Sequence, residues 1–161
     1  MTTTSDTHNQ HISQQFNQEL SEIKSHLLVM GGMVEQQVQD SLKALIEGDS
    51  QLAQSVRDRD KEVDRLERSI DEEATRVIAR RQPTASDLRL LISVVKMVAD
   101  LERIGDEAKK VAKFALVLSE EGQAPRGYVE VRHIGNHVGQ MVRDALDAFA
   151  RFDTESALEG M

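Results

Sequence analysis

The chain has 161 residues, of which 39% are hydrophobic and 30% charged, and its formal net charge is −8 at pH 7. This length suffices for one well-filled hydrophobic core or slightly more. The acidic balance argues against nucleic-acid binding, which needs clustered lysines and arginines, and the lack of cysteine excludes disulfides, thiolate metal sites and cysteine catalysis.

Residues 1–11 are polar and lack helical periodicity, so we expect a disordered tail there. Apolar residues then recur at steps of three and four from Phe16 to Leu45, which predicts a first long helix. The pair Gly31–Gly32 interrupts the helix propensity but not the phase of this stripe. It therefore indicates close packing of a neighbouring helix.

Two short turns divide the following residues into two more helices. Gly48 and Asp49 read as a helix stop followed by an N-cap, and Pro83 ends the second helix. Thr84 begins the third helix, which is expected to continue to about Glu120. Helices of comparable length joined by such short turns must run antiparallel, so residues 12–121 are predicted to form an all-α, antiparallel three-helix bundle.

Residues 122–127 form a linker, after which the sequence repeats itself. When residues 31–57 are shifted by 104 positions onto residues 135–161, nine of the 27 aligned residues are identical. We interpret residues 128–161 as the first helix and the start of the second helix of an incomplete second unit, in a chain that looks truncated. An apolar stripe on this segment needs a partner, so we predict a homo-oligomer, in which the segment could be swapped between chains. The stripe consists of Val138, Met141, Val142, Leu146 and Phe149.

Two acids in the third predicted helix conflict with their surroundings. With a turn of 100° per residue, Glu102 and Asp106 fall in the middle of the side that carries the large apolar residues. Ionised carboxylates are costly to bury without partners, and neighbouring acids repel each other. A hard cation with oxygen ligands would resolve both problems.

A second pair of acids is expected at the same level of the bundle. Asp60 and Asp64 precede Pro83 by 23 and 19 residues, and Glu102 and Asp106 follow it by 19 and 23. We therefore predict a carboxylate site for one or more divalent or trivalent ions, with iron, manganese, magnesium and calcium as candidates. Glu67 is a further candidate ligand, one turn along from Asp64.

Two alternatives remain open. In a metal-free scaffold the acids would instead pair with neighbouring cations, for which the candidates are Arg59, Arg103, Lys109 and Lys110. A carboxylate-bridged di-metal enzyme would need two Glu-x-x-His motifs on separate helices, and the sequence has only Glu130 with His133. No Gly-rich phosphate loop and no nucleophile with a base is visible, so nothing in the sequence supports catalysis.

Three motifs in this order resemble the PhoU family: Asp-Lys-Glu-Val-Asp at 60–64, Pro-Thr-Ala-Ser-Asp-Leu-Arg at 83–89, and Leu-Glu-Arg-Ile-Gly-Asp at 101–106. The resemblance covers about residues 12–159. It implies two tandem three-helix bundles that hold metal clusters, which can be multinuclear, on acidic motifs. By position, the implied ligands are Asp60, Asp64, Glu102 and Asp106, and the second metal site and two helices of the family pattern are missing.

The resemblance also implies a function. It predicts a non-enzymatic negative regulator of phosphate uptake and phosphate-starvation signalling that contacts the ATPase of the phosphate ABC transporter and a sensor histidine kinase. No apolar run approaches the roughly 20 residues that span a bilayer, and no secretion signal is visible. We therefore expect a cytoplasmic protein without membrane insertion, held at the inner face of the membrane only through its partners.

Overall fold

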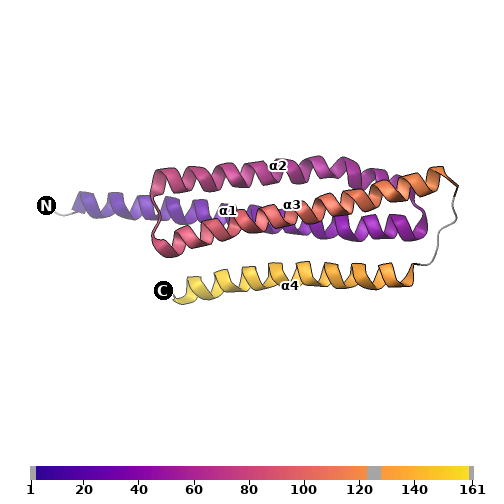
Figure 1. Ribbon diagram of the computed structural model, residues 1–161. Helices are drawn as coiled ribbons and strands as arrows, with labels where there is room; N and C mark the ends of the chain where they lie inside the picture. The colour runs from indigo at the N-terminus through magenta and orange to yellow at the C-terminus, as the bar shows by residue number, and fades with distance from the viewer. Residues whose placement is uncertain (1–2, 123–127, 160–161) are drawn as a thin grey trace.

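The computed structural model describes residues 3–122 and 128–159, with side chains for residues 7–122 and 128–151. These residues form four helices and no strand: α1 (Thr3–Glu47), α2 (Ser50–Arg81), α3 (Ala85–Glu120) and α4 (Val129–Glu159). Helices α1, α2 and α3 run antiparallel as a bundle, and α4 lies alongside (Figure 1). The predicted all-α class and the three-helix bundle are confirmed. None of the described helices is long and apolar enough to cross a membrane.

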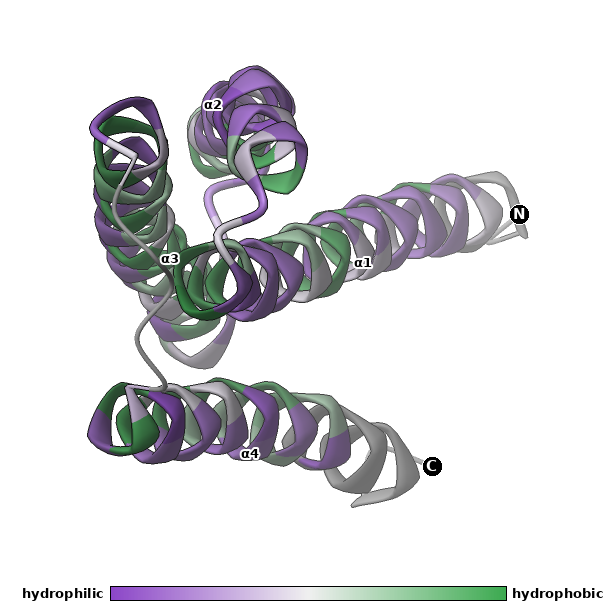
Figure 2. Cartoon of the chain, turned by 90° about the vertical axis from the view of Figure 1, so that its right-hand side faces the viewer, coloured by the Kyte–Doolittle hydropathy of each residue, from purple (hydrophilic) through white to green (hydrophobic). Residues whose placement is uncertain are grey.

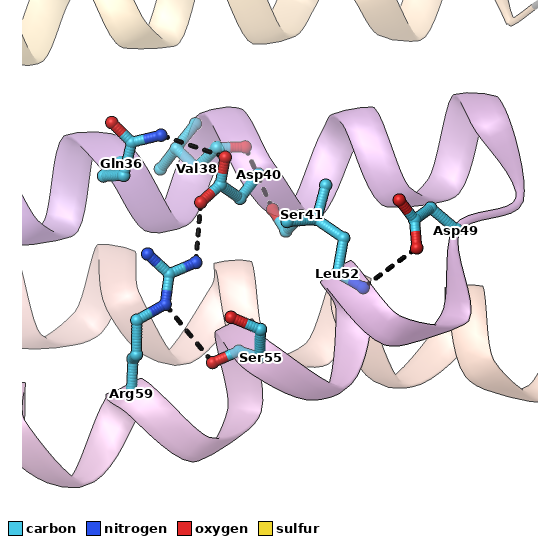
Figure 3. Close-up of polar contacts among 8 residues, drawn as sticks. All are labelled: Gln36, Val38, Asp40, Ser41, Asp49, Leu52, Ser55 and Arg59. Carbon is cyan, nitrogen blue, oxygen red and sulfur yellow. Dashed lines mark hydrogen bonds and ion pairs between the residues drawn. The ribbon is translucent and has the colours of Figure 1, made fainter.

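The turns between the helices form where the sequence predicts them. Gly48 takes a positive φ of 68°, and the carboxylate of Asp49 caps α2 by accepting a hydrogen bond from the backbone N–H of Leu52 at 3.0 Å (Figure 3). Gln82, just before Pro83, has a left-handed backbone with φ 44°. The Thr84 side chain makes no capping bond to the helix backbone, so only the position of this helix start is as predicted.

The core of the bundle is aliphatic, as expected for a chain with so few aromatic residues. Its largest fully buried side chains come from all three helices of the bundle and interlock along their shared axis. They include Ile23, Leu27 and Met30 of α1, Val56, Val63 and Ile70 of α2, and Leu91, Val94 and Val98 of α3.

The buried face of α3 is centred differently from the predicted one. Of the large apolar residues that define the predicted side, Leu91 and Val98 are buried. Ile92 and Val117 belong to the same set but are exposed, and small residues such as Gly105 and Ala108 also face the core. Because small residues carry little hydrophobic signal, the large apolar residues gave a wrong centre for the stripe. Glu102 and Asp106 therefore lie at the edge of the buried face and are half-buried.

The two ends of the described chain also differ from expectation. Helix α1 begins at Thr3, within the segment expected to be a disordered tail, and projects beyond the α2–α3 turn (Figure 1). The side chains of residues 7–15 are all exposed, so little apolar burial supports these turns. Helix α4 continues through Asp153 to Glu159, where a second helix was expected to start.

Helix α4 packs against α1, and in the described residues its close backbone approach is to α1 alone. In the view of Figure 2, α2 and α4 lie on opposite sides of α1. A Cβ atom on Gly31 would come within 2.5 Å of Leu146, and one on Gly135 would collide with Leu42. The predicted close packing at Gly31 is thus confirmed. The two contacts are equivalent under the 104-residue shift, since 31 and 42 become 135 and 146.

The apolar stripe of α4 is mostly covered by the same chain. Val142 is buried, and Leu146 and Phe149 pack against the bundle core. Met141, which was expected in the stripe, is exposed. An ion pair between Arg143 and Glu35 at 2.7 Å closes the edge of this contact. Self-association is therefore not required by this stripe and stays a prediction.

Candidate metal site

Three predicted ligands meet between α2 and α3. Asp64, Glu67 and Glu102 each offer a carboxylate oxygen, and these oxygens lie within 4.8 Å of one another. Asp64 and Glu67 are three residues apart and share a face of α2. Glu102 follows Pro83 by the same 19 residues by which Asp64 precedes it. The equal number of residues from Pro83 therefore correctly predicted that Asp64 and Glu102 lie at the same height along the bundle.

Asp106 belongs to the same electrostatic cluster although it is outside this group of three oxygens. A hydrogen bond with Asp106 is the largest cause that raises the pKa of Glu102, to about 7, followed by burial and by repulsion from the neighbouring acids. Glu102 therefore keeps its proton up to near-neutral pH, as expected for an acid one helical turn from another acid.

Burial and mutual repulsion also act on the two acids of α2. Burial is the main cause that raises the pKa of Asp64, and repulsion by Asp60 adds to it. The pKa of Glu67 is raised mainly by burial and then by repulsion from Asp71. Asp71 has a buried carboxylate oxygen without a hydrogen-bond partner. The cluster is therefore short of positive charge.

Asp60 is placed differently from the other predicted ligands. It is buried, and both of its carboxylate oxygens are engaged: Oδ1 accepts from Nε2 of Gln37 at 3.1 Å and Oδ2 from Nζ of Lys109 at 3.2 Å. Ion pairing, the alternative considered for all of these acids, thus describes Asp60. In the structure as described, Asp60 is not part of the group of three carboxylates.

The other cations considered as partners pair elsewhere. Arg59 bonds Asp40 of α1 at 2.6 Å (Figure 3). Two further pairs form within α3, Arg103 with Asp100 at 3.7 Å and Lys110 with Glu107 at 2.6 Å. Asp64, Glu67 and Glu102 have no ion pair of this kind among the described contacts.

Gln37 is a part of this region that the sequence reasoning missed. Its side chain is buried between the helices, and its Oε1 has no hydrogen-bond partner. A Cβ atom on Gly105 would lie 2.9 Å from that oxygen, so the glycine makes room for the amide. The available signal was a glutamine between Val34 and Val38, inside the apolar stripe of α1.

The histidines do not join the acidic cluster. Glu130 and His133 are exposed on α4, whose close backbone approach is to α1 alone among the described helices. The donor set of the cluster is thus carboxylate oxygen alone, which suits hard cations such as Mg²⁺, Ca²⁺ or Mn²⁺. The residues present fit an oxygen-liganded metal ion.

Comparison with known proteins extends this picture. Residues 27–115 match the family model described as PhoU domain. The chain is 67% identical over 148 residues to a phosphate-specific transport system accessory protein PhoU homolog of Pseudomonas putida. The aligned region covers 92% of this chain and 58% of that protein. The chain is 48% identical over 150 residues to the phosphate-specific transport system accessory protein PhoU of Escherichia coli K12, with 93% and 62% covered.

A solved structure agrees with these sequence matches. The crystal structure of PhoU from Pseudomonas aeruginosa superposes with a TM-score of 0.81 at 63% identity, over 89% of this chain and 69% of that chain. The chain spans only about three fifths of the length of the two curated relatives. Since the family model matches more than half of its residues, this chain belongs to the PhoU domain family.

Proposed function

We propose that the chain acts as a non-enzymatic negative regulator of phosphate uptake and phosphate-starvation signalling. The observation that carries this proposal is the 67% identity, over 92% of the chain, to an accessory protein of a phosphate-specific transport system. The chain spans 58% of that relative, so activity of the whole relative is a hypothesis for this chain. The site chemistry is compatible with it, since the acidic cluster contains no nucleophile paired with a base.

The partners we infer are the ATPase of the phosphate ABC transporter and a sensor histidine kinase. The first follows from the role in phosphate transport that the names of the relatives carry. The kinase follows from the proposed role in phosphate-starvation signalling, since a regulator of that response would act on the kinase that controls it. We place the protein in the cytoplasm, at the inner face of the membrane, where both partners would be reached.

We also propose that the acidic cluster holds one or more divalent or trivalent metal ions. Asp64, Glu67 and Glu102 would be the ligands, with Asp106 as a supporting acid and Asp60 behind them. A bound ion would supply the positive charge that the cluster lacks and would tie α2 to α3. The support is the convergence of three carboxylate oxygens from two helices and the pKa of Glu102 raised to about 7.

Binding to purified partners tests the regulatory proposal. The chain is immobilised, and the transporter ATPase and the cytoplasmic part of the kinase are passed over it with Mn²⁺ or with a chelator. We expect saturable binding of both proteins that weakens on chelation. A chain carrying Asp64→Asn and Glu102→Gln should bind as the chelated protein does. Absence of binding to both partners with Mn²⁺ present would contradict the proposal.

A further inference from the structure

A buried polar group lies directly behind the acidic cluster and is built by three helices. Gln37 of α1 and Lys109 of α3 both bond Asp60 of α2. The side chain of Asp60 is 3% exposed and that of Lys109 is 45% exposed. The ammonium group therefore reaches inward from the surface to a carboxylate that water scarcely reaches. Gly105 provides the space in which Gln37 approaches α3.

This pair continues the acidic cluster on both helices. Lys109 follows Asp106 by three residues and Glu102 by seven, so the three share one face of α3. Asp60 precedes Asp64 by four residues on α2, one turn away. Both Asp60 and Lys109 act on Asp64 electrostatically, since the charge of Asp60 raises the pKa of Asp64 and the charge of Lys109 lowers it. Lys109 is thus a fixed positive charge at the inner end of the cluster.

We propose that Lys109 is the residue that sets the metal affinity of this site. Its ammonium pairs with Asp60 in place of a metal ion, and it repels an ion bound at the outer carboxylates, which are those of Asp64, Glu67 and Glu102. The inference rests on the metal site proposed above. Like charges in one partly buried site repel more strongly than in water. Without Lys109, the repulsion would end and Asp60 would add an uncompensated negative charge beside the ion.

Calorimetric titration with Mn²⁺ tests this proposal on the full chain. For Lys109→Met we expect Mn²⁺ to bind about tenfold more tightly or better than to the unchanged chain. Unchanged or weaker binding would overturn the inference. If the unchanged chain itself bound no Mn²⁺, the proposed metal site would fail first, which is a different result from equal affinities of the two proteins.

Lys110→Met is the matched control. It removes one positive charge from the adjacent position of α3, also from a pair with an acid, since Lys110 bonds Glu107 at 2.6 Å. Both of these side chains are exposed, so solvent screens their charges. We expect the Mn²⁺ affinity of this variant to stay close to that of the unchanged chain. An equal gain in affinity would show a net-charge effect and would overturn the specific role of Lys109.

A double variant covers the case in which Lys109→Met fails to fold because Asp60 is left buried and unpaired. The combination of Lys109→Met with Asp60→Asn is neutral, as the natural pair is. If Lys109 acts through its charge, this variant should bind Mn²⁺ with nearly the affinity of the unchanged chain. A loss of about tenfold or more would mean that Asp60 is itself a ligand, and would overturn the proposal.

Discussion

Glu102 is the residue whose protonation reports most directly on the crowding of the acids. Its pKa of about 7 in the folded chain lies above the ordinary value of 4.5, and the hydrogen bond with Asp106 is the first cause. The folded state therefore holds this proton more tightly than the unfolded state does. The stabilisation is fully present below about pH 4.5 and is lost as the pH rises through about 7.

Glu102→Gln should remove this pH dependence in the metal-free chain. A glutamine is neutral and can still donate a hydrogen bond to Asp106, so it resembles the protonated glutamate. We expect the variant and the unchanged chain to be equally stable at pH 5, and the variant to be more stable by about 1 kcal/mol at pH 8. Urea unfolding at both pH values, with a chelator present, measures this. Equal stabilities of the two proteins at pH 8 would show that the neighbouring acids do not destabilise the ionised Glu102.

Asp60 should matter for stability even without metal. Asp60→Ala would leave Gln37 and Lys109 without their shared acceptor in the interior. Because Lys109 can turn partly to solvent, we expect a loss of about 2 kcal/mol rather than the larger cost of a fully buried pair. Asp58→Ala, at an exposed position of the same helix, should cost less than about 0.5 kcal/mol in the same unfolding assay. Similar costs for both variants would contradict the structure around Asp60.

At the residue scale, the sequence predicted that Asp64, Glu67 and Glu102 meet. It did not predict that Asp60 is paired separately. Equal distances from Pro83 placed Asp64 and Glu102 at one level. Among the described contacts, Asp60 pairs with Lys109, whereas Asp64, Glu67 and Glu102 do not. This difference depends on which side chains reach the interior between the three helices. The contact with Gln37 depends in addition on the missing side chain of Gly105. Periodicity in one helix carries no such information.

At the scale of elements, helix boundaries followed local chemistry closely. Gly48 with Asp49, and Pro83 with Thr84, end and begin helices as expected, because these signals are local. Gly48 and Pro83 act through their backbone, and Asp49 through its capping side chain. Asp153 lies in the repeat position of Asp49 but starts no helix. Phe152 stands where the first unit has Gly48, and a bulky residue does not favour the left-handed backbone with which Gly48 ends α1.

The two neighbouring glycines of α1 offer a matched test of the α1–α4 contact. Gly32 is exposed and a Cβ atom there would meet nothing within 4 Å, whereas one on Gly31 would press on Leu146. We expect Gly32→Ala to stabilise the chain by about 0.5 to 1 kcal/mol through helix propensity. Gly31→Ala should gain nothing or destabilise, because Leu146 must move. Thermal unfolding compares the two, and an equal gain would contradict the packing of α4 on α1.

At the scale of the whole molecule, the repeat in the sequence corresponds to a repeat in the packing. Gly31 with Leu146 and Gly135 with Leu42 are the same contact made twice, once in each direction. Such reciprocity is the pattern of a two-fold interface. The nine identities between the two segments thus include the residues that bring α1 and α4 together.

Self-association remains to be tested, and its most suitable surface is the outer side of α4. Ile134 and Met141 are 64% and 59% exposed there, seven residues apart and so on one face. We expect a dimer in sedimentation equilibrium, and a monomer when both residues are changed to Lys. Changing Gln140 and Asp144 to Lys instead, at exposed positions of the same helix, should leave the dimer intact. A monomer for the unchanged chain at high concentration would contradict the prediction.

The central claim is that acids of α2 and α3 hold a metal ion between them. Anomalous diffraction from crystals of the chain grown with Mn²⁺ tests it most directly, because it locates the ion without assuming its ligands. We predict an anomalous peak in contact with Asp64, Glu67 and Glu102, with Lys109 still bonded to Asp60. A map with no peak at these carboxylates, or with manganese only at the exposed histidines of α4, would contradict the account.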